Sequence, residues 1–280
     1  MLKQRIITAL VLAPLVLAAI FKLPLFGLGL VFALVILLAA REWSRVVSDK
    51  NNQRLSFFLI FCLVFGLSLW QIPLSLVAHS IWFSGLLAVA VIAWSASVYL
   101  LASFPYRAKF WHNNHFFKVM VGLIVLVPFF WSLLFLRSID EDNPLVGGAW
   151  VVYVFSLVWA ADSGAYFVGK RFGKRKLAKN VSPKKTIEGL LGGLLFASVV
   201  TIAALVFLDI PEGKTLVLVI ASACTVLASV VGDLVESMFK RQAGIKDSGT
   251  LLPGHGGLLD RIDSLTAAMP VFAFFFLHWM

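Results

Sequence analysis

The stretch FFKVMVGLIVLVPFFWSLLFL, residues 116–136, contains a single charged side chain, Lys118, near its start. A helix needs about 20 apolar residues to cross the hydrocarbon core of a bilayer, and this stretch is long enough. Comparable apolar runs occur along the whole chain, at 6–21, 24–40, 55–71, 81–103, 148–168, 188–208, 214–236 and 264–279. The sequence therefore predicts an all-α polytopic integral membrane protein with about nine transmembrane helices.

The composition supports a membrane protein independently of any motif. Of the 280 residues, 60% are hydrophobic and only 14% are charged, whereas soluble domains carry about 25% charged residues. The net charge of +10 would suggest nucleic acid as a partner of a soluble protein. In a membrane protein it is better explained by orientation and by contact with anionic lipid, so no nucleic-acid partner is expected. Cys62 and Cys224 lie inside apolar runs, which argues against a disulfide or a metal cluster.

The distribution of cations predicts how the chain is oriented. Of the 24 Lys and Arg residues, all but Lys22, Arg137 and Lys214 lie in the N-terminal segment or in every second connection after it. These segments are on the same side of the membrane as the N-terminus. Because cytoplasmic loops are enriched in Lys and Arg, we expect a cytoplasmic N-terminus and a C-terminus outside. We interpret residues 1–280 as one membrane domain. Within it, 1–147 form spans of mainly structural role and 148–280 form the catalytic region.

The first group of polar residues at membrane depth lies in WAADSGAYFVGKRFGKRKLAKNVSPKKTIEGLLGG, residues 159–193. Asp162 falls inside the sixth span, where an ionised carboxylate usually faces water, a cation or a pairing partner. Ser182-Pro183-Lys184-Lys185-Thr186 directly precedes a glycine-rich helix start, and such a start favours phosphate. Alternatively, the cations anchor the loop to anionic lipid, and Glu188 is a first-turn capping residue.

The second group lies in VGDLVESMFKRQAGIKDSGTLLPGHGGLLDRIDS, residues 231–264. Helical spacing places Asp233, Glu236, Ser237 and Lys240 on one face. Two carboxylates on one face near a membrane boundary suit a divalent cation, and Mg²⁺ prefers carboxylate and phosphate oxygens. The alternative is pairing of both acids with Lys240 inside the helix.

A glycine-rich turn, Pro253-Gly254-His255-Gly256-Gly257, then leads into the last span. His255 either donates a hydrogen bond to a phosphate or is an exposed imidazole. A zinc site is disfavoured because no further His or Cys is near. Asp260 and Asp263 sit three residues apart at a helix start. They are therefore either members of a site or acids of the helix cap and first turn.

The stretch SMFKRQAGIKDSGTLLPGHGGLLDRID, residues 237–263, resembles the signature of the phosphatidate cytidylyltransferase family. The matching positions are Ser237, Lys240, Arg241, Lys246, Asp247, Pro253, His255, Gly256, Gly257, Asp260, Arg261 and Asp263. The Asp162 segment and the segment 182–189 also resemble upstream motifs of that family, so the similarity is specific over roughly residues 150–265. It implies transfer of CMP from CTP to phosphatidic acid, a requirement for Mg²⁺ with one or two metal ions, nine spans and a homodimer. It further implies an enzyme of phospholipid biosynthesis in a bacterial cytoplasmic (inner) membrane.

The resemblance and the residue chemistry together suggest roles for the side chains. Asp233 and Asp260 are expected to hold the metal, supported by Glu236, Asp162 and Asp263. Lys240 and Arg241 join Asp233 and Asp260 as catalytic residues because they can hold phosphates. The expected substrate-binding residues are Ser182, Lys184, Lys185, Thr186, Ser237, Lys246, His255, Gly256, Gly257 and Arg261.

Three alternatives remain at this point. A CTP-dependent lipid kinase or a cytidylyltransferase acting on an ether-lipid or isoprenoid phosphate would carry related motifs. An ion-coupled transporter would use Asp162 and Asp233 as its buried carboxylates.

Overall fold

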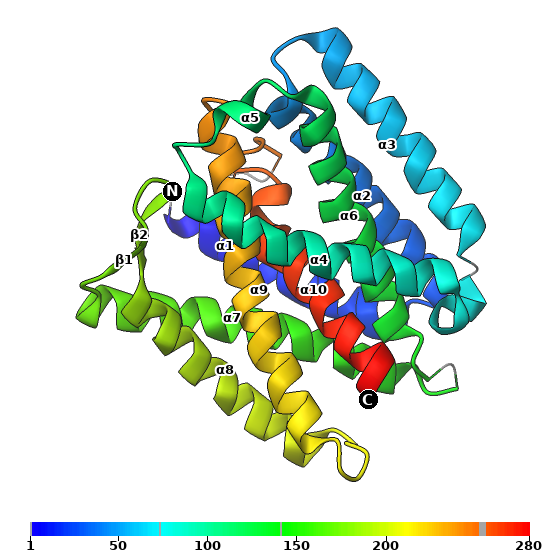
Figure 1. Ribbon diagram of the computed structural model, residues 1–280. Helices are drawn as coiled ribbons and strands as arrows, with labels where there is room; N and C mark the ends of the chain where they lie inside the picture. The colour runs from blue at the N-terminus through cyan, green and yellow to red at the C-terminus, as the bar shows by residue number, and fades with distance from the viewer. Residues whose placement is uncertain (1, 73, 141, 252–255) are drawn as a thin grey trace.

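The computed structural model describes residues 2–72, 74–140, 142–251 and 256–280 (Figure 1). Long helices account for all nine expected spans. They are α1 (Leu2–Lys22), α2 (Leu25–Val47), α3 (Asn51–Gln71), α4 (Ile81–Ser103), α6 (His115–Arg137), α7 (Pro144–Phe172), α8 (Ile187–Phe207), α9 (Thr215–Gln242) and α10 (Leu259–Trp279). Within the described ranges, eight of these helices are long and apolar enough to cross a membrane, and α1 contributes the shorter apolar helix Leu10–Lys22. The predicted all-α membrane fold is confirmed, whereas the orientation of the termini stays a prediction.

Several helices begin where the sequence supplies a capping side chain. Ser80 Oγ accepts a hydrogen bond from Phe83 N at the start of α4, and Asn114 Oδ1 accepts one from Phe117 N at the start of α6. These bonds satisfy backbone N–H groups that have no partner inside the helix. The caps therefore fix where the connections end and the apolar helices begin.

Helix α6 forms the centre of the bundle and α3 lies at its edge. Within the most apolar window of each helix, 78% of α6 but only 17% of α3 is buried inside the protein. Figure 1 shows the same arrangement, with α3 at the edge of the bundle beside α2. A helix that is apolar all round must face either protein or lipid, so the exposed apolar surface of α3 is suited to lipid.

The crossing of α9 and α10 brings the second polar segment together. A Cβ atom added at Gly232 of α9 would lie 2.7 Å from the backbone oxygen of Asp263 and 3.0 Å from Ala267 Cβ. Small residues let membrane helices approach closely, and here they bring the acidic turn of α9 against the first turns of α10.

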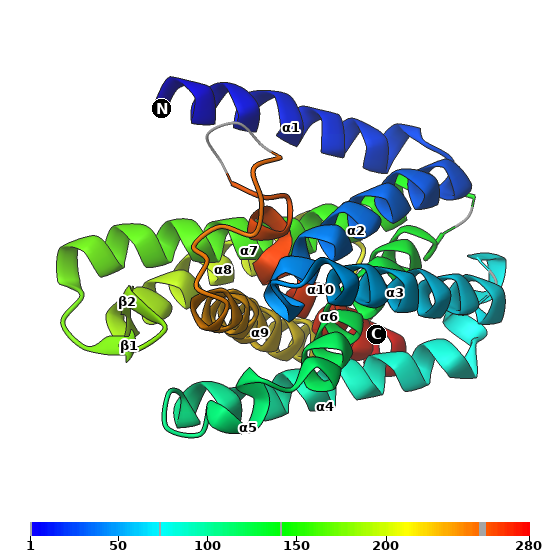
Figure 2. The same ribbon diagram turned by 90° about the horizontal axis from the view of Figure 1, so that it is seen from above.

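Residues 176–186 form a β-hairpin that the sequence analysis did not anticipate. Strands β1 (Lys176–Ala178) and β2 (Ser182–Thr186) are antiparallel and pair Lys176 with Thr186 and Ala178 with Ser182. The hairpin lies at the end of α7, as Figure 2 shows. A 3₁₀ helix (η1, Leu74–His79) and a short α-helix (α5, Lys109–His112) complete the described elements. The pairing satisfies backbone groups between two helices, and it gives the basic segment a defined shape.

The close α9–α10 crossing predicts a stability difference between two glycine variants. Gly232→Ala should be destabilised by about 1–3 kcal/mol because the new methyl group overlaps α10. Gly85→Ala in α4 is the matched control, since nothing lies within 4 Å of its added Cβ. Both variants gain similar helix propensity, about 1 kcal/mol. Thermal unfolding in detergent should therefore show a lower midpoint for Gly232→Ala alone, and equal midpoints would contradict the close crossing.

Candidate active site

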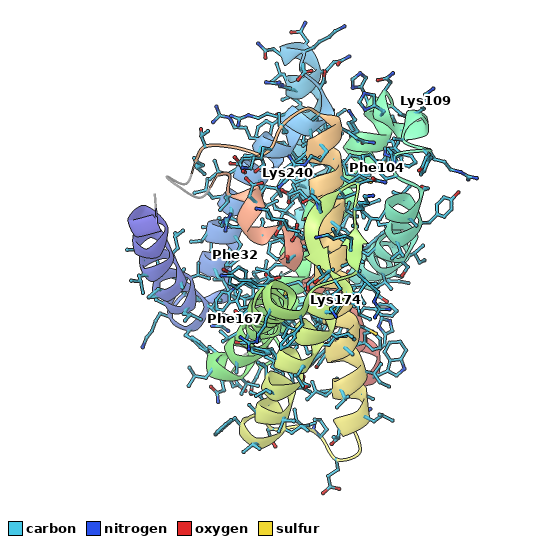
Figure 3. All side chains as sticks on the ribbon, turned by 90° about the vertical axis from the view of Figure 1, so that its left-hand side faces the viewer. Phe32, Phe104, Lys109, Phe167, Lys174 and Lys240 are labelled. Carbon is cyan, nitrogen blue, oxygen red and sulfur yellow. The ribbon has the colours of Figure 1, made fainter. Side chains whose placement is uncertain are left out.

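Lys240 is the centre of a buried charge cluster between α9 and α10. Its Nζ atom lies 2.6 Å from Asp260 Oδ1 and 2.9 Å from Glu236 Oε1, and all three side chains are at most 10% exposed. Figure 3 labels Lys240 where the end of α9 meets the start of α10. Buried charges are tolerated when they are paired. Intrahelical pairing with Glu236, one of the two alternatives for this face, does occur, but the same ammonium group also joins the two helices.

Asp260 organises the loop between these helices. Its Oδ2 atom accepts hydrogen bonds from Ser248 N at 2.9 Å and from Gly257 N at 2.8 Å, in addition to the Lys240 contact on Oδ1. Gly256 adopts a φ of 85°, and a Cβ there would lie 2.8 Å from Asp260 Oδ2. Because both carboxylate oxygens already accept bonds, a cation at Asp260 would compete with Lys240. Metal binding by Asp260 stays a prediction.

Asp233 and Lys185 bring the two polar segments together. Lys185 Nζ, from β2, lies 2.5 Å from Asp233 Oδ2, and Ser237 Oγ donates to Asp233 Oδ1 at 3.2 Å. The side chains of Lys185 and Asp233 are 26% and 27% exposed, so solutes can reach this pair. Lys185 and Asp233 are 48 residues apart in the sequence but lie in contact. The sequence analysis predicted that both belong to the site, but not that they form a pair.

A cavity of about 420 Å³ opens beside this pair. Its polar lining includes Asp162, Lys184, Lys185 and Thr186, and glycines of α7 and α8 form part of its wall. Thr186 Oγ1 also accepts a hydrogen bond from Gly189 N at 3.1 Å, so this side chain is the N-cap of α8. Pockets of this size hold small ligands, and here three side chains expected to contact substrate line the same cavity as Asp162.

Glu188 fixes the hairpin to the start of α8. Its carboxylate accepts hydrogen bonds from Lys174 N at 3.0 Å and from Arg175 N at 3.1 Å. The expected first-turn position is confirmed, but the partners are backbone N–H groups of the preceding connection and the Arg175 side chain. These contacts hold the basic segment against the start of α8.

The expected catalytic residue Arg241 and the remaining expected substrate-binding residues are more dispersed. Arg241, Lys246 and Arg261 have exposed side chains, and Ser182 is half-buried at the start of β2. Gly256 and Gly257 form the turn that contacts Asp260, whereas His255 and Pro253 lie outside the described residues. The roles assigned to these residues stay predictions.

The donor chemistry at the α9–α10 crossing fits a divalent cation that is shared with substrate. Among the residues that the structure describes, no three His, Cys, Asp or Glu side chains form a metal-binding group of their own. Mg²⁺ is usually bound by one or two carboxylates together with substrate phosphates, so a closed protein cage is not required. Asp233 is accessible, and Glu236 Oε1 is buried with the Lys240 ammonium group 2.9 Å away.

The sequence analysis missed a contribution from α2. The Glu42 carboxylate accepts hydrogen bonds from Leu258 N, Leu259 N and Ser248 Oγ, at 3.1, 2.8 and 3.1 Å. Arg45 Nη1 donates to Ser248 O at 3.1 Å. The sequence did offer one signal for this contact, because Glu42 is a carboxylate at the end of an apolar span, in REWSR. The first 147 residues therefore include side chains that touch the second polar segment.

Lysines held at membrane-embedded acids beside a cavity suit anionic phosphates, so the fold and the site define a membrane-embedded enzyme acting on phosphorylated substrates. Comparison with known proteins narrows this class. Residues 3–279 match the model of the cytidylyltransferase family, and the chain belongs to this family.

Two named relatives match nearly the whole chain, and a third matches about two thirds of it. A phosphatidate cytidylyltransferase of Haemophilus influenzae is 43% identical over 289 residues, covering 99% of both chains. One of Pseudomonas aeruginosa is 42% identical over 273 residues, covering 98% of this chain and 96% of the relative. One of Bacillus subtilis is 38% identical over 64% of this chain and 65% of the relative.

The contacts of Glu188 predict a change in the accessibility of the hairpin. Glu188→Gln should loosen the segment 174–179, because the amide offers one acceptor oxygen to donors that now share a carboxylate. Trypsin should then cleave after Lys174, Arg175 or Lys176 several-fold faster, as followed by mass spectrometry. Glu212→Gln, at an exposed acid between α8 and α9, is the control. Identical cleavage rates in both variants would show that Glu188 does not hold the hairpin.

Proposed function

We propose that this enzyme transfers CMP from CTP to phosphatidic acid, giving CDP-diacylglycerol and pyrophosphate. The observation that carries the proposal is the Lys185–Asp233 contact, which places a cation and an accessible carboxylate at the edge of the 420 Å³ cavity. Membership of the cytidylyltransferase family and the names of the full-length relatives support the same reaction.

The reaction requires two anions to meet. A phosphate oxygen of phosphatidic acid attacks the α-phosphorus of CTP, and the bond from that phosphorus to the oxygen bridging to the β-phosphorus breaks. The electron pair leaves with pyrophosphate, and the new P–O–P linkage joins CMP to the lipid. The nucleophile is already ionised near neutral pH, so the main demand on the protein is to position the reactants and offset their charge.

The described side chains can meet this demand. Lys184 and Lys185 line the cavity, where they can hold phosphates, and Lys240 maintains the α9–α10 junction. Mg²⁺, held by Asp233 with support from Glu236 and Asp263, would offset charge on the phosphates when bound. In this arrangement Asp233 holds the Lys185 ammonium group at the cavity edge, and an arriving phosphate competes with Asp233 for it.

We further propose a homodimer in a bacterial cytoplasmic membrane, with the N-terminus and the basic connections on the cytoplasmic side. Bacterial relatives and the membrane-spanning helices support this setting. CTP is a cytoplasmic nucleotide and phosphatidic acid is a lipid, so a site at the cytoplasmic edge of the bilayer gives access to both.

The fate of the nucleotide distinguishes the proposed reaction from its alternatives. Purified protein is incubated with phosphatidic acid, Mg²⁺ and CTP labelled at the α-phosphorus. The label should appear in lipid, with one pyrophosphate released for each lipid labelled. Label recovered as CDP would indicate a kinase. Transfer only to an ether-lipid or isoprenoid phosphate would change the substrate, and no turnover of CTP would contradict the proposal.

Removing either central carboxylate should abolish most activity. Asp233→Asn and Asp260→Asn should each lower CDP-diacylglycerol formation on the order of a hundredfold or more, because the first leaves Lys185 without its acidic partner and the second leaves Lys240 with Glu236 alone. Asp209→Asn, at an exposed acid between α8 and α9, is the control and should retain normal activity. Folding is checked by gel filtration in detergent. Near-normal rates in both folded variants would contradict the assigned roles.

A further inference from the structure

Glu42 is a buried acid in α2, far along the chain from the residues it contacts. The residue is 7% exposed, and its hydrogen-bond partners lie more than 200 residues away in the sequence. An ionised carboxylate is stable in such surroundings only when hydrogen bonds replace its lost water. Glu42 has three such bonds, all from the segment that leads into α10.

Two of these donors are the first backbone N–H groups of α10. Leu258 is the N-cap residue of this helix, and its own side chain makes no capping bond. The first N–H groups of a helix have no partner inside it and carry the positive end of the helix dipole. Glu42 therefore acts as a capping side chain supplied by another helix, one position before Asp260.

Ser248 connects this cap to the charge cluster. Its hydroxyl group donates to Glu42, its backbone N–H donates to Asp260, and its carbonyl oxygen accepts from Arg45. The residue is fully buried. The orientation of the Asp260 carboxylate, and with it the Lys240 contact, is thus tied to α2 through one serine.

The backbone around Glu42 is adapted to this contact. A Cβ atom at Gly249 would overlap the Glu42 carboxylate, and one at Gly257 would lie 2.5 Å from Glu42 Oε2 and overlap Ser248 Oγ. Only glycine lets the loop backbone come this close at both positions. The space between the loop and α2 is therefore filled by the carboxylate itself.

We propose that Glu42 is a positioning residue for the transfer reaction: by capping α10 and holding Ser248, it sets the geometry of Asp260 and Lys240. The expected change in kcat rests on the proposed function, whereas the expected capping of α10 does not. It assigns to the N-terminal half of the chain a part in catalysis beyond membrane anchoring.

The kinetic test uses the full-length enzyme in detergent with CTP and phosphatidic acid. Glu42→Gln should lower kcat on the order of ten- to a hundredfold, because small displacements of reacting groups have effects of this size. KM for CTP should change less than about threefold, since Glu42 lies outside the cavity. Asp49→Asn is the matched control: its side chain is 91% exposed in the connection that follows α2, and it should retain normal kinetics.

A double-mutant cycle separates positioning from a general loss of stability. Ser248→Ala removes one donor to Glu42 and should lower kcat by less than Glu42→Gln does. In the Glu42→Gln background it should have almost no further effect, because the bond it removes is already weakened. A normal kcat in Glu42→Gln would overturn the proposal. So would a double variant whose loss of kcat equals the product of the two single-variant losses.

Hydrogen exchange tests the structural half whatever the enzyme's substrate proves to be. The amides of Leu258 and Leu259 should exchange faster in Glu42→Gln than in wild type and in Asp49→Asn. Unchanged exchange would overturn the capping role even in an active enzyme. A wild-type protein that makes no CDP-diacylglycerol, yet shows the exchange difference, would instead overturn only the proposed function.

Discussion

A carboxylate placed at the edge of a bilayer must be paired, and this requirement organises the C-terminal half of the molecule. Glu236 and Asp260 share the ammonium group of Lys240, and Asp233 holds that of Lys185. An unpaired buried charge costs several kcal/mol, so these contacts constrain how the elements can pack. The first joins α9 to α10, and the second draws the β-hairpin onto α9. The cavity lies between the hairpin and helices α7, α8 and α9.

The same pairing explains how the site can serve chemistry between two anions. A lysine held by a carboxylate is already oriented and partly dehydrated when a phosphate arrives, so less reorganisation is needed in the transition state. Lys185 has this character at the cavity edge, where it is partly exposed. Lys240 is more deeply buried and serves the architecture, together with Asp260 and the cap that Glu42 provides from α2. The positioning role that we propose for Glu42 would give the N-terminal half of the chain a part in catalysis as well.

The sequence predicted the spans well because the thickness of the bilayer dictates their length and apolarity. It also placed Asp233, Glu236 and Lys240 on one face, since helical periodicity is a local property. The hairpin escaped prediction because its strands are short and basic, and their pairing depends on the helices that flank them. Glu42 was missed for a related reason: its partners are more than 200 residues away, and only the packed bundle reveals them. Proximity between distant segments, rather than residue type, was the missing information.

The most direct test of this account is a cryo-electron microscopy structure with a non-hydrolysable CTP analogue and Mg²⁺. The account predicts the triphosphate in the cavity of α7, α8 and the hairpin, within hydrogen-bonding distance of Lys184 and Lys185. An ion should lie at about 2.1 Å from an Asp233 oxygen. A nucleotide bound elsewhere, with the Lys185–Asp233 contact unchanged and no ion near Asp233, would contradict it.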